Sequence, residues 1–218
     1  MIELIAFLGN YGKEYQNTRH NTAWLFEESL PFSSKLSWQN KFKGEFASVD
    51  FTDFVSWLAS SSLIKARSDG SLPVAPEAPK RLYFLKPLTY MNLSGDAIGE
   101  AARFYKIPPE NILVVHDEIE LAPGMVSLKW SGGLGGHNGL RSAKAVLGTA
   151  DFWRLRLGVG KCTKGSVADY VLGSFSQDES IILSQVFAMT AVLFAKLLTC
   201  KDPKNLIPEW GKKKLVEV

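Results

Sequence analysis

Cysteine is scarce in this 218-residue sequence, and its two cysteines lie far apart. Cys162 and Cys200 form no CxxC pair, so a redox or zinc motif built on cysteine is not expected. A chain of this length also needs no disulfide to hold a core. The low cysteine content is typical of a protein that works in a reducing compartment, and we expect a cytoplasmic location.

Long apolar runs are also missing. The longest, residues 186–198, is interrupted by Thr190 and Lys196 and is shorter than the roughly 20 residues that a bilayer requires. The first ten residues, MIELIAFLGN, include Glu3 and have no cationic stretch before the apolar residues, so a secretory signal is not expected. We therefore expect no membrane span.

Charge of one sign is not in large excess either. The net charge is +3, which is too small to identify a partner. Hydrophobic residues make up 46% of the chain and charged residues 22%, which excludes a disordered chain. This balance and length predict a single soluble domain over residues 1–218.

The positive charges are unevenly distributed along the chain. Residues 125–168 contain seven lysines and arginines and only one acidic residue, so the remainder is mildly acidic. A locally positive face suits a polyanion, because phosphate contacts supply affinity without reading sequence. An ordinary solvated surface explains the same count equally well.

Apolar runs alternate with helical patterns, which predicts an α/β layer fold with a mainly buried sheet. Ser94 is expected to cap a helix that ends before Pro108 and Pro109. The later part of the Ser- and Pro-rich stretch 60–79 is expected to be a surface connection. The expected strands are 2–9, 46–51, 81–87, 112–121, 126–130 and 154–160, and the other expected helices are 140–147 and 178–200.

The three histidines are the first candidates for chemistry. His20, His116 and His137 each lie in a polar segment beside an Asn or Asp, in the contexts TRHN, HDE and GGHNG. Strand ends and loops are where α/β proteins bind ligands. We therefore regard these segments as better candidates for a site than the strands themselves.

The residues alone leave four interpretations open. Zinc ligation lacks an HExxH-type spacing, and nucleotide binding lacks the GK[ST] of a P-loop and a complete GxGxxG. A structural account uses the glycines of SGGLGGHNGL for turns and its His and Asn as caps. A hydrolase that pairs His with an acid is the fourth, and without a GxSxG elbow an activated water is a better attacking group than a covalent nucleophile.

Six segments, in order, resemble the motifs of bacterial peptidyl-tRNA hydrolase. They are GNYGKEYQNTRHN (9–21), KPLTYMNLSG (86–95), HDEIELAPG (116–124), GGLGGHNGLRS (132–142), FWRLRLGVG (152–160) and VADYVLGSF (167–175). The resemblance implies a single-domain α/β fold with a mixed, mainly parallel sheet surrounded by helices. It also implies a cytosolic, generally monomeric hydrolase without metal or other cofactor, which cleaves the ester between a peptide and the 3′ end of tRNA.

The resemblance assigns the catalytic roles. His20 becomes the general base that deprotonates the attacking water, and Asp117 becomes its partner. A carboxylate that accepts from one imidazole nitrogen fixes the tautomer and stabilises the imidazolium that forms. Asn10 is placed near His20 and the terminal nucleotide.

The resemblance also assigns substrate contacts. Asn92 and Asn138 are expected at the peptide and the attacked carbonyl, since an amide offers a donor and an acceptor without charge. Met91 and Tyr15 match apolar and aromatic positions near the cleft, where plain packing is an equally good explanation. Lys129 and Arg156 match the basic pair that clamps the 5′ phosphate of tRNA, and Arg141 and Lys144 could extend that surface.

The sequence departs from the family pattern in three places. Tyr11 replaces the usual Pro of GNPG, Leu134 replaces a His, and the connection 60–80 is longer than usual. We expect altered affinity but intact chemistry. No membrane or obligatory protein partner is expected, and the alternative is a non-catalytic RNA-binding relative of the splicing-factor type, which shares this fold.

Overall fold

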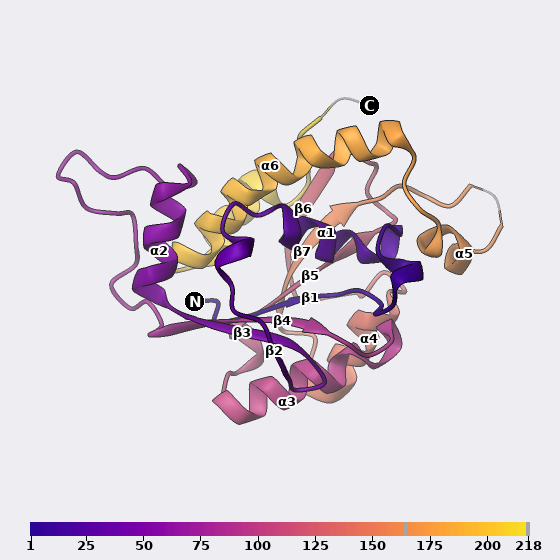
Figure 1. The fold of residues 1–218 in the computed structure, drawn as a ribbon, viewed down its shortest axis with the longest axis horizontal. Coiled ribbons are helices and arrows are strands. Elements are labelled where there is room, and N and C mark those ends of the chain that lie inside the picture. The colour runs from indigo at the N-terminus through magenta and orange to yellow at the C-terminus, as the bar shows by residue number, and fades with distance from the viewer. Residues whose placement is uncertain (164, 217–218) are drawn as a thin grey trace.

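The computed structural model describes residues 1–163 and 165–216. Eight strands form one mixed sheet in the order β2-β3-β4-β1-β5-β7-β6-β8 (Figure 1). The four central strands β4, β1, β5 and β7 are parallel, and antiparallel strands flank them on both sides. The strands are β1 (Leu4–Phe7), β2 (Gln39–Lys41), β3 (Gly44–Asp50), β4 (Arg81–Pro87), β5 (Ile112–Glu118), β6 (Met125–Trp130), β7 (Trp153–Gly158) and β8 (Lys213–Lys214).

Helices cover both faces of this sheet, so the expected α/β architecture with a mainly parallel sheet is confirmed (Figure 1). The helices are α1 (Thr22–Ser29), α2 (Phe51–Ser60), α3 (Ser94–Tyr105), α4 (Asn138–Leu147), α5 (Val167–Leu172), α6 (Gln177–Thr199) and α7 (Ile207–Trp210).

The alternation of side chains along β1 divides the core in two. Ile5 and Phe7 pack in a cluster with residues of α1, α2 and α6, whereas Leu4 and Ala6 pack in a second cluster with α3 and α4. Successive strand residues point to opposite faces, so a strand buried on both faces is apolar throughout. This explains why IELIAFLG contains no alternating pattern.

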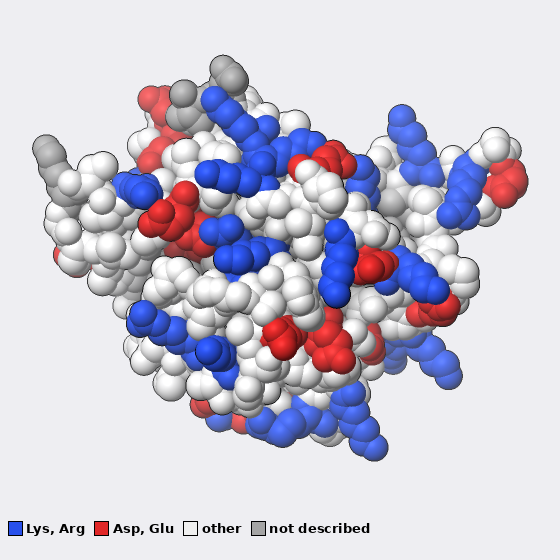
Figure 2. Space-filling view, turned by 180° about the vertical axis from the view of Figure 1, so that it is seen from behind, with Lys and Arg blue, Asp and Glu red and all other residues white. Residues whose placement is uncertain are grey.

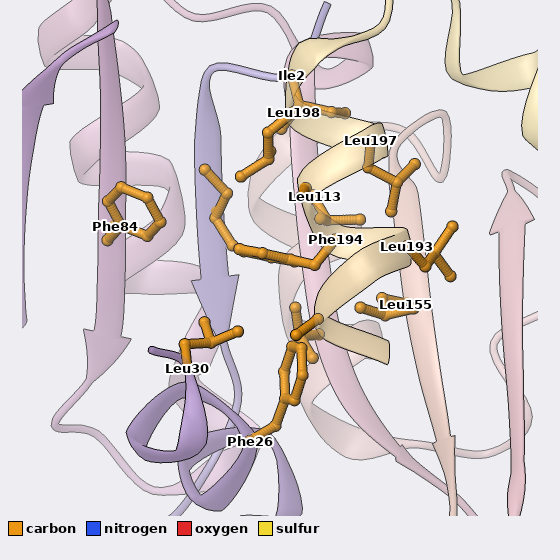
Figure 3. Packing of buried hydrophobic residues seen from close by; sticks show 14 of the residues in the cluster. Ile2, Phe26, Leu30, Phe84, Leu113, Leu155, Leu193, Phe194, Leu197 and Leu198 are labelled. Carbon is orange, nitrogen blue, oxygen red and sulfur yellow. The ribbon is translucent and has the colours of Figure 1, made fainter. Parts of the chain in front are cut away.

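Helix α6 is long and apolar enough, by length and composition alone, to cross a membrane. Its residues Leu193, Phe194 and Leu197 instead lie against the sheet in the larger core cluster (Figure 3). Ser176 and Glu179 form a capping box at its start. The apolar composition of α6 therefore fits a core helix.

Several local expectations need correction. Ser94 is the first residue of α3 and does not cap it; the N-cap is Leu93, and the Ser94 hydroxyl donates to the Met91 carbonyl at 2.9 Å. Helices α1, α2, α5 and α7 were not expected. The stretch 61–80 has no helix or strand, as expected of its later part, but Leu72 and Val74 pack against the core.

Candidate active site

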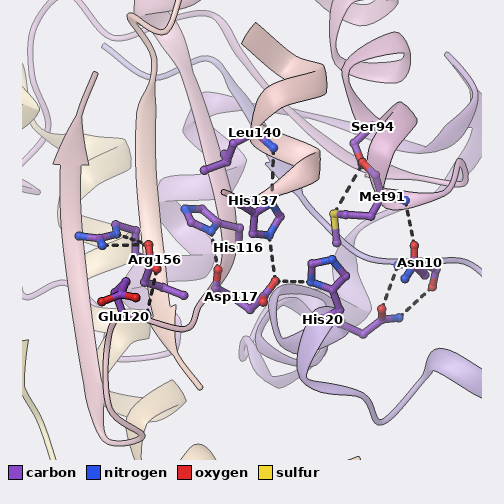
Figure 4. Close-up of polar contacts among 12 residues, drawn as sticks. Asn10, His20, Met91, Ser94, His116, Asp117, Glu120, His137, Leu140 and Arg156 are labelled. Carbon is purple, nitrogen blue, oxygen red and sulfur yellow. Dashed lines mark hydrogen bonds and ion pairs between the residues drawn. The ribbon is translucent and has the colours of Figure 1, made fainter. Parts of the chain in front are cut away.

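The candidate active site lies where the first and fifth strands end. His20 follows the loop after β1, in the 3₁₀ turn Arg19–Asn21, and Asp117 is the penultimate residue of β5. The two strands are parallel neighbours, so their carboxyl ends lie at the same edge of the sheet. Residues 97 positions apart in sequence therefore meet, and His20 Nδ1 lies 2.8 Å from Asp117 Oδ1 (Figure 4).

His137 is a second histidine on the same carboxylate. Its Nε2 lies 3.0 Å from Asp117 Oδ1, and its Nδ1 accepts a hydrogen bond from the backbone N–H of Leu140 at 3.4 Å. His137 thereby caps α4, as the structural interpretation of the glycine-rich loop foresaw for a histidine or asparagine. Sequence reasoning noted GGHNG but did not place His137 in the catalytic group.

These bonds define different tautomers for the two histidines. A carboxylate only accepts, so His20 donates through Nδ1 and keeps a lone pair on Nε2, whereas His137 donates through Nε2. A second proton on His137 requires its Nδ1 lone pair, which already accepts the Leu140 N–H. His20 is therefore the histidine with a nitrogen available as a base.

Asp117 is ionised in this arrangement. Its side chain is 2% exposed, and burial acts to raise its pKa, but His137 and His20 outweigh that effect and hold the pKa well below the usual range. The carboxylate can thus serve as a fixed acceptor for both imidazoles at neutral pH.

His116 completes a group of three histidine rings but has a different role. Its ring centroid is 4.8 Å from that of His137, and its Nδ1 lies 2.6 Å from the carbonyl oxygen of Asp117. Burial, with the neighbouring His137 ring, lowers the pKa of His116 well below its usual value. Its Nε2 is buried without a hydrogen-bond partner, so this ring is sealed from a substrate.

A cleft with a volume of about 760 Å³ opens over the His20 and Asp117 side chains. The side chains of α5, including Val167 and Leu172, form one wall of it. The cleft brings together most of the residues that the sequence predicted for the site, namely Asn10, Tyr15, His20, Met91, Asn92, Asp117 and Asn138.

The three asparagines are placed differently in the cleft. Asn92 and Asn138 are exposed, so their amides are open to a ligand. Asn10 is buried, and its Oδ1 accepts the backbone N–H of Met91 at 2.8 Å. Asn21, which sequence reasoning missed, holds the Asn10 backbone with two hydrogen bonds of 2.9 Å.

The turn that carries His20 is anchored by its neighbour Arg19. The Arg19 guanidinium pairs with Glu179 at the start of α6, stacks on the Tyr170 ring at 4.6 Å and donates to the Ser174 carbonyl at 2.9 Å. It therefore joins His20 to the segment around α5, which forms the opposite wall. The sequence offered only the motif TRHN as a signal for this contact.

Lys129 and Arg156 lie outside this cleft, on β6 and β7. In the antiparallel register Lys129 pairs with Arg154, and Ser127 pairs with Arg156, so all four side chains share one face of the sheet. Burial, together with Arg154 and Arg156, lowers the pKa of Lys129. The expected basic pair is thus brought together near the site.

The charge count of residues 125–168 overstated this positive surface. Arg154 is 1% exposed and donates to the Gly133 carbonyl inside the protein, while Arg156 and Lys161 are paired with Glu118 and Glu120. Lys164 lies outside the described residues. On the face seen in Figure 2, Lys and Arg side chains are widely spread, with Asp and Glu among them.

Two histidines and a carboxylate can also bind metal. Ligand atoms of His20, Asp117 and His137 lie within 4.8 Å of one another. A metal ion there must replace both hydrogen bonds to Asp117. With its present hydrogen bonds, the group of His20, Asp117 and His137 is suited to proton transfer.

The fold and this site define an α/β protein with a histidine–carboxylate pair of the kind that hydrolases use. A family model for peptidyl-tRNA hydrolase matches residues 4–215, and the chain belongs to this family. The peptidyl-tRNA hydrolase of Treponema pallidum is 41% identical over 100% of this chain and 98% of its own length. That of Desulfitobacterium hafniense is 40% identical, over 85% of this chain and 86% of its own.

A solved structure agrees with these sequence comparisons. The crystal structure of peptidyl-tRNA hydrolase from Acinetobacter baumannii has a TM-score of 0.72 and 31% identity, and the match covers 95% of this chain and 91% of that one. The family predicted from the six motifs is confirmed. The comparisons give no support to the alternative of a non-catalytic splicing-factor relative.

Proposed function

We propose that this chain hydrolyses the ester between a peptide and the 3′ end of tRNA. The observation that carries the proposal is the 2.8 Å contact of His20 Nδ1 with Asp117, which leaves Nε2 of His20 as an acceptor in a cleft lined by amides. Membership of the peptidyl-tRNA hydrolase family supplies the substrate class.

The reaction follows from the free nitrogen of His20. Nε2 takes a proton from a water molecule as the water oxygen attacks the ester carbonyl carbon, and the imidazolium is stabilised by Asp117. When the tetrahedral intermediate collapses, the bond from carbon to the ribose oxygen breaks. His20 then returns its proton to the tRNA hydroxyl.

The amides serve the substrate in this proposal. Asn92 and Asn138 bind the peptide and the attacked carbonyl, and one well-aimed donor to a developing oxyanion is worth about 3 kcal/mol. Asn10 holds Met91 in the wall beside His20 and faces the terminal nucleotide. Tyr15 and Met91 add apolar contacts to the same wall.

The tRNA body is held on the neighbouring strands. We assign Lys129 and Arg156 to its 5′ phosphate, with Arg141 and Lys144 of α4 extending the surface toward the acceptor stem. A cation in this position discriminates substrates that carry the phosphate from those that lack it. Ester hydrolysis itself needs no such group.

The catalytic pair and the cleft are both built by a single chain, which supports action as a monomer without an obligatory protein partner. Membership of the family supports a cytoplasmic location. The test is release of tRNA from N-acetyl-aminoacyl-tRNA by the purified protein. Release that increases with protein concentration supports the proposal, and its absence at every concentration overturns it.

A further inference from the structure

The guanidinium of Arg156 is already occupied in this structure. Its Nε and Nη2 each lie 2.8 Å from Oε2 of Glu118, and its Nη1 lies 3.2 Å from the Ser127 hydroxyl. The Arg156 side chain is 18% exposed and that of Glu118 is 7% exposed. The ion pair is therefore largely withdrawn from solvent and is not a loose surface contact.

Glu118 occupies the same edge of the Arg156 guanidinium that a bound phosphate needs. Carboxylate and phosphate both bind arginine through paired oxygens facing Nε and Nη2, because the planar guanidinium presents those donors in a fixed fork. A phosphate that grips Arg156 in this way must share the fork with Glu118 or displace it.

Glu118 also balances the other cations of this face. Its negative charge acts on Lys129 and Arg154, opposing the lowering of their pKa by burial and by Arg156. Arg154 carries two buried nitrogens without a hydrogen-bond partner, so it remains a poorly compensated cation behind the pair. Among these charged side chains, three are cations and Glu118 alone is an anion.

Glu118 connects this face with the catalytic cleft. It directly follows Asp117 and is one of the residues that line the cleft. A Cβ placed on Gly135, in the loop that leads to His137, lies 3.6 Å from both carboxylate oxygens of Glu118. The carboxylate thus lies between the arginine and the glycine-rich loop.

We infer that Glu118 is a built-in competitor for the phosphate site, a carboxylate that occupies Arg156 until a substrate phosphate replaces it. The inference rests on the proposed function for the clamp of Lys129 and Arg156. By this competition Glu118 weakens the binding of small anions and of nucleic acid that lacks a well-placed terminal phosphate. It therefore determines specificity without touching the ester.

A positioning role for Glu118 predicts the opposite behaviour. If Glu118 only holds Arg156 in its productive orientation, removing its charge releases the arginine and weakens phosphate binding. Competition and positioning therefore predict opposite changes in phosphate affinity when the charge of Glu118 is removed.

The experiment compares Glu118→Gln with the wild type in binding a short acceptor-stem RNA hairpin, with and without a 5′ phosphate. The glutamine keeps the shape of the side chain and removes its charge. We expect affinity for the phosphorylated hairpin to rise roughly five- to tenfold and affinity for the 5′-hydroxyl hairpin to change little. Inorganic phosphate is expected to compete more strongly with the phosphorylated hairpin in the variant.

Glu120→Gln is the matched control. Glu120 is two residues away, is exposed and pairs with Lys161 at 3.0 Å, so this variant makes the same change in net charge without freeing Arg156. Glu118→Asp is the second test variant in case the glutamine does not fold, since a shorter carboxylate draws away from the guanidinium; it is expected to shift affinity in the same direction.

An unchanged or weakened affinity of the variant for the phosphorylated hairpin overturns the inference, as does an equal gain in Glu120→Gln. The hairpin carries no ester, so this result is independent of hydrolysis. If the wild type releases tRNA but the affinities do not move as expected, the inference fails alone. If binding moves as expected without any hydrolysis, the proposed function fails alone.

Discussion

At the scale of single residues, hydrogen bonding sets the roles of the three histidines more than proximity does. Three histidine rings lie close together and all contact Asp117, yet each uses its two ring nitrogens differently. His116 donates to a backbone carbonyl and His137 caps a helix, while His20 retains an unprotonated nitrogen. The division of labour follows from which nitrogen each ring has left, a detail that sequence cannot supply.

The buried His116 predicts a pH dependence of stability. Its pKa in the folded state is lowered well below the ordinary histidine value of 6.5, so the unfolded chain binds a proton there that the folded chain does not. Stability is therefore lost as the pH falls below about 6.5, by up to about 1.4 kcal/mol per pH unit for this one group. Urea unfolding at a series of pH values between 7 and about 5 measures the slope.

His116→Gln is the comparison for that measurement, since glutamine does not titrate. The variant is expected to be less stable at pH 7 but to lose less stability on acidification than the wild type. An identical slope in both proteins contradicts the assignment of this pH dependence to His116.

At the scale of elements, the site is held by close packing between α3 and α4. A Cβ on Gly95 of α3 comes within 2.2 Å of the Ser142 carbonyl oxygen of α4, a distance that real atoms do not adopt. Helix α4 begins with Asn138 and is capped by His137, so its position determines where both side chains lie. The glycine of KPLTYMNLSG thus serves helix packing.

Gly95→Ala tests that packing. Because the obstacle is backbone, the helices must separate, and we expect the free energy of unfolding to fall by about 1–3 kcal/mol with a loss of activity. Gly133→Ala is the control, because nothing lies within 4 Å of its added Cβ; its stability is expected to stay within about 0.5 kcal/mol of the wild type. Equal stability of Gly95→Ala and the wild type, measured by urea unfolding, contradicts the packing argument.

The elements also show what the sequence could predict. The apolar runs predicted the buried strands β1, β4 and β5, because a strand covered on both faces is apolar along most of its length. Helix α2 was missed because TDFVSWLA reads equally well as a continuation of the preceding strand. Strands β2 and β8 were missed because they have only three and two residues. Strand β2 forms a tight hairpin with β3, whereas β8 pairs with β6, which is distant in sequence.

The site was predictable to the extent that its members belong to motifs. His20, Asp117 and the asparagines were named from such segments, and the structure brings them into one cleft. The contacts of Arg19 with Glu179 and of Arg156 with Glu118 were not predictable, because a pair of charges 160 or 38 residues apart has no local pattern.

At the scale of the whole molecule, the proposed function uses two adjoining regions for one substrate. In that proposal the cleft over His20 and Asp117 takes the ester, and the face of β6 and β7 takes the terminal phosphate. In this proposal, ester hydrolysis and binding of the tRNA phosphate therefore depend on different residues. Variants of one region are expected to leave the other intact.

Arg156→Ala tests this separation. The variant is expected to bind the 5′-phosphorylated substrate more weakly, with a shallower dependence of affinity on salt by about one charge, because one phosphate contact is lost. Release from a substrate without the phosphate is expected to continue at the wild-type rate. Arg103→Ala, which removes the same charge from the exposed surface of α3, serves as the control.

The clamp assignment is wrong if Arg156→Ala discriminates against the dephosphorylated substrate as strongly as the wild type does. A similar change in Arg103→Ala assigns the effect to overall charge and equally contradicts the clamp.

The most direct measurement of the central claim is single-turnover release of tRNA from N-acetyl-aminoacyl-tRNA by the wild type and by His20→Ala, with protein in excess. Loss of the general base is predicted to slow release by at least about a hundredfold, while tRNA affinity stays within about twofold. Release by the variant at the wild-type rate, or a parallel loss of binding and release, contradicts the claim that His20 is the base.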